Sequence, residues 1–213
     1  ETQQALMVKH GRYSEGDSIY KHLKPETVAL IADRLAEFGL PIERVENYRP
    51  GMIAITLTAL QAGKLGYTAE QGLDRYFMQK ARYKKPIRQI EEFEFQMALL
   101  AKLPEDDEVL TASFKNMDDY AQQWHDTMAA WKNGDGQGLY DSTIGSALAE
   151  YPQLVSFFDV LFFDRHERMN QVAEQCIHDK EVCFIVVGAG HLLGDKGLVK
   201  ALLDKGYQVE QLK

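Results

Sequence analysis

The 213-residue sequence contains only two cysteines, Cys176 and Cys183. This number excludes the disulfide-dense scaffolds of small secreted domains. It also argues against a zinc site made of cysteines, because structural zinc takes four ligands. The two thiols either form one disulfide in an oxidising compartment or remain reduced and buried, and their spacing leaves both alternatives open.

Long hydrophobic runs and clusters of positive charge are also missing. The longest apolar run, residues 182–187, is far shorter than the ~20 residues of a membrane-spanning helix. Acidic residues outnumber basic ones by 32 to 24, which gives a net charge of −8. Because affinity for nucleic acids comes largely from neutralised phosphates, this acidic balance predicts no nucleic-acid partner. The short apolar run predicts no membrane span in this chain. The sequence does not define the oligomeric state.

Several enzyme signatures are absent from the sequence. There is no Gly-x-Ser-x-Gly, no His-Glu-x-x-His and no completed Gly-x-Gly-x-x-Gly, and neither cysteine has a cationic neighbour that would activate it. These absences argue against a serine triad, a zincin, a dinucleotide enzyme and a cysteine nucleophile. The chain begins at Glu1 rather than at Met and carries no targeting segment, which indicates a mature or processed form.

What is present is mostly helical periodicity, with 45% hydrophobic and 26% charged residues. Strands are predicted over residues 86–90, 182–187 and 207–212, and the second of these is apolar enough to be buried on both faces. We therefore predict an α/β (α+β) fold: a helix-rich single domain over residues 1–213 with a small central sheet and a C-terminal helix-strand-helix-strand order. The helical middle, about residues 92–163, is the alternative candidate for a separate lobe.

His191 is the first candidate functional residue. It follows the predicted strand 182–187 through Gly188-Ala189-Gly190. Open α/β sheets bind ligands at the carboxyl ends of their strands, and the two glycines allow close approach to the backbone. The alternative is a plain strand-to-helix turn in which His191 only caps.

A basic pair and a carboxylate are the next candidates. Arg165 and Arg168 lie on the polar side of a predicted helix over residues 165–179, where a guanidinium suits anion binding. A surface ion-pair cluster explains them equally well. Glu91, at the end of the predicted strand 86–90, would serve as a base or metal ligand, or else cap the next helix.

Several motifs recur together along the chain. The stretch Phe184-Ile185-Val186-Val187-Gly188-Ala189-Gly190-His191-Leu192 is followed by Gly197-Leu198 and Gly206-Tyr207-Gln208-Val209. Upstream lie Arg49-Pro50, Gly72-Leu73-Asp74, Ile90-Glu91 with Gln96, and Arg165. Together they resemble the motifs of the TraB/GumN family, whose relatives include the Tiki metalloproteases and the pheromone-shutdown protein PrgY. The resemblance covers nearly the whole chain.

The resemblance implies a divalent-metal-dependent hydrolase, peptidase-like, acting on a peptide or small-molecule substrate with a metal of the Mn, Co or Zn type. It assigns His191 and Glu1 as metal ligands and Glu91 and Arg165 as catalytic groups, with Glu91 as ligand or base and Arg165 stabilising an oxyanion. The residues expected to position substrate or backbone are Gly188, Gly190, Asp74 and His166.

The chain also departs from the family pattern. Two Gly-x-x-His motifs are expected, and only Gly188-x-x-His191 is present. Glu1 resembles the acidic residue that follows the first motif, so we expect the first strands and half of the metal site to lie upstream. His166 stands where the family usually has Asn.

The alternative that the resemblance supports is a non-catalytic peptide- or haem-binding regulatory module of the same superfamily. PrgY-like members are associated with pheromone sequestration, and a branch resembling ChaN binds haem. Many bacterial relatives are exported, so a periplasmic or otherwise exported location is expected. Such a location favours a Cys176–Cys183 disulfide.

Overall fold

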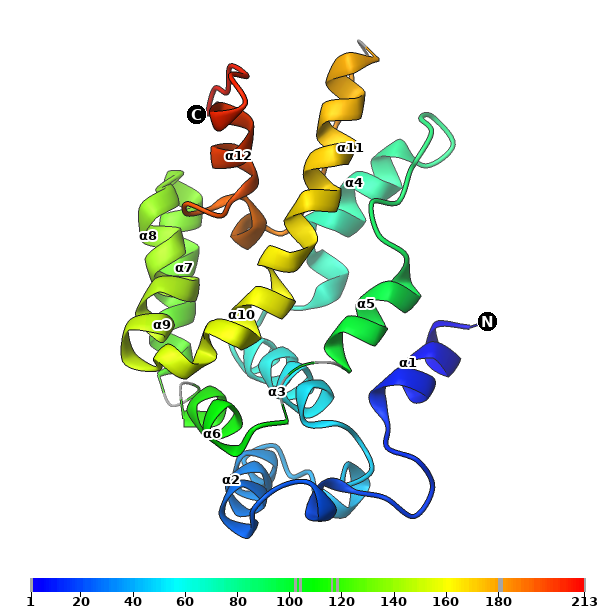
Figure 1. The fold of residues 1–213 in the computed structure, drawn as a ribbon, viewed down its shortest axis with the longest axis vertical. Helices are drawn as coiled ribbons and strands as arrows, with labels where there is room; N and C mark the ends of the chain where they lie inside the picture. Colours follow the sequence, from blue (N-terminus) through cyan, green and yellow to red (C-terminus); the bar gives the residue numbers. More distant parts are fainter. Residues whose placement is uncertain are drawn as a thin grey trace.

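The structure of the chain is a computed structural model that describes residues 2–101, 103, 105–115, 117, 119–179 and 182–212. Helices make up most of it (Figure 1). The α-helices in these residues are α1 (Gln3–Gly11), α2 (Pro25–Ala36), α3 (Pro50–Lys64), α4 (Leu73–Ala81), α5 (Phe93–Leu100), α6 (Asp107–Lys115), α7 (Tyr120–Asn133), α8 (Gly136–Tyr140), α9 (Ser146–Glu150), α10 (Val155–Leu161), α11 (His166–His178) and α12 (Leu198–Asp204).

Short turns connect several of these helices. One is a π-helical turn, η4 (Asp141–Gly145), which joins α8 to α9. The 3₁₀ turns are η1 (Ile19–Lys21), η2 (Ile42–Arg44), η3 (Ala69–Gln71), η5 (Pro152–Leu154), η6 (Phe163–Arg165) and η7 (Ala189–Leu192). None of the described helices is both long and apolar enough to cross a membrane, in agreement with the sequence.

The prediction of an α/β fold with a central sheet is wrong. The structure is 67% helical, and the described residues form no strand and no sheet, so the fold is all-α. The predicted strands at residues 86–90, 182–187 and 207–212 are neither helical nor part of a β-ladder with any other described segment, and Val182 is fully exposed. A β-branched run prefers extended backbone, but a strand exists only where a second backbone completes its ladder.

The first hydrophobic core lies at the N-terminal end of the chain. Pro25 opens α2 and Pro50 opens α3, each in the first turn, where a proline costs no helical hydrogen bond. Helix α2 turns Val28, Ile31 and Leu35 inward at helical spacing. The buried members of this core are Tyr13, Ile19, Leu23, Val28, Ile31, Leu35, Ile53, Ala54, Leu57, Leu110 and Phe114.

Helix α6 also contributes to a second core. Its Leu110 and Phe114 pack into the first core, whereas Val109 and Ala112, on another face, pack into the second. The buried residues of the second core are Val109, Ala112, Ile144, Ala147, Leu154 and Phe158. One amphipathic helix therefore ties the N-terminal helices to α9 and α10. Whether residues 92–163 form a separate lobe stays a prediction.

Helices α10 and α11 run in succession through the centre of the molecule, joined by η6 (Figure 1). Helix α5 packs against α10 and also against α1. On the surface between α1 and α5, Glu94 accepts a hydrogen bond from Lys9 at 2.7 Å and lies 3.1 Å from His10. Because α5 packs against α10, the turn before α5 lies beside η6, which follows α10. This arrangement positions the candidate site.

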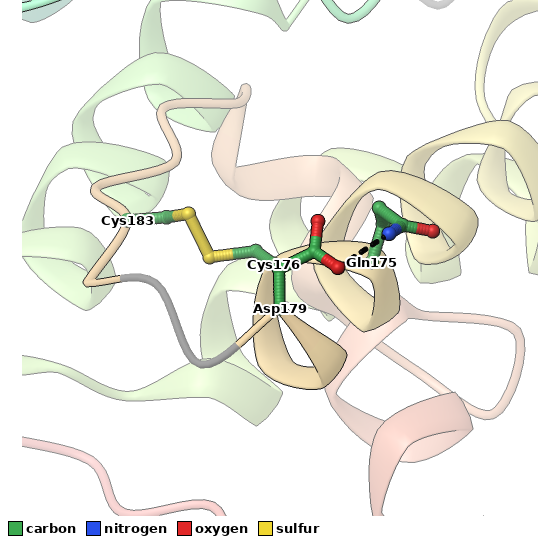
Figure 2. Close-up of a disulfide and its surroundings, with 4 residues drawn as sticks. All are labelled: Gln175, Cys176, Asp179 and Cys183. Carbon is green, nitrogen blue, oxygen red and sulfur yellow. Dashed lines mark hydrogen bonds between the residues drawn. A yellow bond between two sulfur atoms is a disulfide. The ribbon is translucent and has the colours of Figure 1, made fainter.

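A disulfide joins Cys176, near the end of α11, to Cys183 (Figure 2). The two Cα atoms are 6.4 Å apart, within the range that a disulfide spans. Beside it, the Gln175 side chain donates a hydrogen bond to Asp179 at 2.8 Å, which closes the last turn of the helix. Of the two alternatives that the sequence left open, the structure has the bonded one.

Removing this disulfide is expected to lower the free energy of unfolding by about 2 kcal/mol, because the unfolded chain gains conformational entropy when the bond is lost. The effect is at the low end of the range for disulfides because the closed loop is short. The measurement is urea unfolding of the oxidised chain with and without dithiothreitol. The double variant Cys176→Ala/Cys183→Ala should match the reduced chain and be insensitive to the reductant. Two titratable thiols in the denatured, unreduced chain would contradict the bond.

Candidate functional site

The centre of the site is a buried ion pair between Glu91 and Arg165. Glu91 lies in the turn before α5, and Arg165 ends η6. Arg165 Nε donates to both carboxylate oxygens, at 2.9 and 3.1 Å, and its Nη2 donates to Oε2. The side chains are only 3% and 16% exposed, for Glu91 and Arg165 respectively. Two segments 74 residues apart are therefore joined by a bidentate contact, the strongest geometry for this pair.

Two further hydrogen bonds fix the pair. Gln96, on α5, donates from Nε2 to Glu91 Oε2 at 3.2 Å, and Arg165 Nη1 donates to the carbonyl oxygen of Leu161 at 3.0 Å. Burial by itself would raise the pKa of Glu91. The hydrogen bonds from Arg165 and Gln96 and the charge of the guanidinium outweigh burial, so the pKa of Glu91 lies below its ordinary value. Glu91 is therefore an ionised acceptor whose oxygens are already engaged.

Two histidines lie in contact next to this pair. His166 is the first residue of α11 and His191 lies in η7, and both are buried. His166 Nε2 is 3.0 Å from His191 Nδ1, and His166 Nδ1 is 2.6 Å from the carbonyl oxygen of Lys196. The rings meet nearly edge to face. The junction between η6 and α11 therefore brings the adjacent residues Arg165 and His166 to Glu91 and His191 respectively.

Both histidines are neutral at pH 7. Burial lowers the pKa of His191 to about 4, and the positive charge of Arg165 acts in the same direction. Burial also lowers the pKa of His166, against the opposing effect of its hydrogen bond to the Lys196 carbonyl. A neutral imidazole has a nitrogen lone pair for a proton or a metal ion.

The loop around His191 is packed against α10 and η6. The side chain of Lys196 forms an ion pair with Asp159 at 2.7 Å, and the ring of Phe162 lies 5.2 Å from that of His191. A Cβ atom on Gly190 would come 2.7 Å from the Phe162 ring, whereas one on Gly188 would meet nothing closer than 3.7 Å. The close approach that requires a glycine is therefore to Phe162, at Gly190.

This difference predicts unequal effects of two alanine substitutions. Gly190→Ala should lower the free energy of unfolding by about 1–3 kcal/mol, because the new methyl group must displace Phe162 and with it the packing of His191. Gly188→Ala is the matched control and should change stability little. Urea unfolding of the two variants measures the difference, and equal losses would show that the contact with Phe162 does not matter.

A small cleft opens beside the ion pair. It has a volume of about 140 Å³, and its lining residues are Gln96, Met97, Leu99, Leu100, Leu161 and Arg165. Arg165 has five N–H groups, and its bonds to Glu91 and Leu161 leave two of them without an acceptor among the described residues. The side chain that carries them is thus part of the wall of this cleft.

Not every predicted residue joins the site. Asp74 is exposed in the first turn of α4, and no hydrogen bond or ion pair in the described part of the chain links it to Glu91 or His191. Arg168 points elsewhere and lies over the ring of Phe95. Glu1, a predicted metal ligand, lies outside the described residues.

Comparison with known proteins identifies the family. The TraB/PrgY/gumN family model matches residues 1–211, almost the whole chain. This chain belongs to the TraB/PrgY/gumN family. The resemblance seen in the sequence motifs is thereby confirmed. No solved structure matches the chain.

Individual relatives fit the same family. The chain is 31% identical over 158 residues to the uncharacterized protein YbaP of Escherichia coli (strain K12). The matched region covers 70% of this chain and 54% of YbaP. The figures for YbaP of Shigella flexneri are the same. The chain therefore spans about half the length of the curated TraB/PrgY/gumN relatives it matches.

Two contributors to this TraB/PrgY/gumN site escaped the sequence analysis. Phe162 packs on His191, and the Lys196 carbonyl accepts from His166. Gly197, the residue after Lys196, belongs to one of the motifs found in the sequence. The Lys196 carbonyl itself could not be found in this way, because every residue has a backbone carbonyl and the side chain does not show which one accepts a hydrogen bond. Phe162 is one of several aromatic residues in residues 157–163, and only the missing Cβ at Gly190 points to it.

Proposed function

We propose that this chain carries part of the active site of a divalent-metal-dependent hydrolase directed at peptide bonds, with His191 as a metal ligand. The observation that carries the proposal is the neutral, buried imidazole of His191 next to the Glu91–Arg165 pair. Membership of the TraB/PrgY/gumN family supports it. The metal, the reaction and the substrate are all part of the proposal.

The donor set fits a metal in kind but is incomplete in number. His191 Nδ1 is hydrogen-bonded to His166, as the second ring nitrogen of a metal-ligating histidine commonly is. Glu91 is engaged by Arg165 and Gln96, and the described residues contain no group of three His, Cys, Asp or Glu side chains that would hold a metal. A catalytic zinc takes three protein ligands, so a complete site needs donors beyond these residues.

The chain's own groups would act around that metal. A bound divalent ion supplies polarisation of the scissile carbonyl and an acidified water. Glu91 holds the Arg165 guanidinium in place, and the two free N–H groups of Arg165 donate to a substrate oxygen in the adjacent cleft. Because Glu91 neutralises the charge of Arg165, this help comes from directed hydrogen bonds rather than from net positive charge.

The haem-binding alternative has less support from the geometry. Pockets for drug-sized ligands and cofactors usually have volumes of roughly 300–1,000 Å³. The cleft beside Arg165 has about 140 Å³. We therefore place the hydrolase first, and a Soret shift on haem titration that depends on His191 would reverse that order.

Metal binding by the full-length protein tests the proposal, because the described residues hold only part of the donor set. Equilibrium dialysis against Co²⁺, Mn²⁺ or Zn²⁺ should give bound metal for the unaltered full-length protein and a loss of it for His191→Ala. The matched control is His125→Ala, which removes an exposed histidine on α7 and should retain the metal. Cleavage of an unstructured peptide should then require the added metal. Equal metal content in all three proteins would contradict the role of His191.

A further inference from the structure

The hydrogen bonds of His166 define which of its ring nitrogens carries a proton. A carbonyl oxygen only accepts, so the 2.6 Å contact with Lys196 requires a proton on His166 Nδ1. The ring is buried, its neighbour Arg165 is a cation, and no described carboxylate forms a hydrogen bond with it. His166 is therefore neutral, and its Nε2 has a lone pair and accepts.

The contact with His166 also defines which ring nitrogen of His191 carries a proton. Its Nδ1 lies 3.0 Å from the accepting Nε2 of His166, so Nδ1 carries the proton and donates it. A neutral imidazole has a single N–H, so His191 Nε2 is left with its lone pair. No described residue forms a hydrogen bond with that nitrogen. The nitrogen that is free to bind a ligand is thus selected two hydrogen bonds away, at the Lys196 carbonyl.

Packing holds both rings in this orientation. His166 meets the ring of Phe163, and His191 meets that of Phe162. A half-turn of the His166 ring would place a carbon at the Lys196 carbonyl, and a half-turn of the His191 ring would place a carbon at His166 Nε2. Each half-turn costs a buried hydrogen bond, so the network specifies one arrangement.

We propose that His166 is a positioning residue that holds His191 in its Nδ1–H tautomer and thereby directs the His191 Nε2 lone pair to a ligand. The tautomer follows from the hydrogen bonds alone. The identification of the ligand as a divalent metal ion rests on the proposed function.

The tautomer is observable without any metal. In the ¹⁵N-labelled, metal-free chain at pH 8, two-bond ¹⁵N–¹H correlation spectra should show His191 with Nδ1 protonated and Nε2 as the unprotonated nitrogen. The His191→Ala spectrum assigns the signals. If the unaltered chain shows His191 with Nε2 protonated, the proposal is overturned, and this outcome depends on no variant.

Two substitutions separate positioning from packing. His166→Phe keeps a buried ring but removes the acceptor, and His191 should then shift toward the Nε2–H form. His166→Gln can place an amide oxygen where Nε2 was, and should retain the Nδ1–H form. His125→Gln, on the exposed face of α7, is the control and should change nothing. An unchanged His191 tautomer in His166→Phe would refute the positioning role.

Co²⁺ titration of the full-length protein adds the functional readout. His166→Phe should weaken binding roughly 10–100-fold, whereas His166→Gln should stay close to the unaltered protein. If the Nδ1–H tautomer is present and the unaltered full-length protein binds no metal, the proposed function fails and the positioning role stands. If metal binds equally in all variants while the tautomer changes, His166 does not act through His191 on the ligand.

Discussion

Replacing Glu91 with alanine is expected to lower the free energy of unfolding by about 3–5 kcal/mol. The substitution leaves the Arg165 guanidinium buried with an uncompensated charge, and two more of its N–H groups lose their acceptor. An uncompensated buried charge costs far more than the ion pair gains, because the desolvation of the charge remains. Urea unfolding at pH 7.5 measures the loss.

A second variant and a control make this result specific. Glu91→Leu combined with Arg165→Met removes both charges and should recover much of the stability that Glu91→Ala loses. Glu94→Ala removes an exposed carboxylate three residues further on, which pairs with Lys9, and should change stability little. The single variants Glu91→Leu and Arg165→Met complete the comparison. If the stability lost by the double variant equals the sum of the losses of these two, the side chains do not act as a pair.

Acidification is expected to destabilise the metal-free chain by about 3 kcal/mol through His191. The pKa of His191 is about 4 in the folded chain, against an ordinary value of 6.5. Between these values the unfolded chain binds more protons than the folded one, so the free energy of unfolding falls as the pH falls from 6.5 toward 4. The groups that act on His191 are Arg165, His166 and Glu91.

The neighbouring groups add to this dependence with the same sign. The pKa of His166 is also lowered, and that of Glu91 lies below its ordinary value, so protonation of either costs stability in acid. Unfolding free energies measured in steps from pH 7.5 to 4.5 should therefore decrease steadily. His191→Leu should flatten that slope, whereas His125→Ala should not. A His191→Leu chain with the slope of the unaltered chain would contradict the buried neutral state.

The helices were predictable because their signals are local. Val28, Ile31 and Leu35 recur at helical spacing behind Pro25, a pattern typical of an amphipathic helix, and all of them lie in α2. The strand 182–187 was predicted from an equally local signal, its β-branched composition. A sheet is a pairing between distant backbones, and in this chain the exposed Val182 and Phe184 (72% exposed) show that composition alone does not supply the partner.

The residues of the candidate site were also predictable from local signals, whereas the contacts between them were not. Glu91, Arg165 and His191 were each singled out from their positions in the sequence. Their assembly depends on contacts across 74 residues, between Glu91 and Arg165, and across 25, between His166 and His191. No periodicity in the sequence reports such contacts. The resemblance to the family brought the residues together before the structure did, and it gave Asp74 a role that the structure leaves untested.

The disulfide and the histidine contact are nested along the chain. The His166–His191 contact closes a loop of 25 residues, and inside it the bond between Cys176 and Cys183 closes one of 7. The disulfide shortens the outer loop by the 7 residues of the inner one, which changes the free-energy cost of closing the outer loop by only about 0.3 kcal/mol. A thiol reductant should therefore weaken the fold as a whole while leaving the two imidazoles in contact. The histidine pair is in this sense independent of redox poise, and the same arrangement is compatible with an oxidising or a reducing compartment.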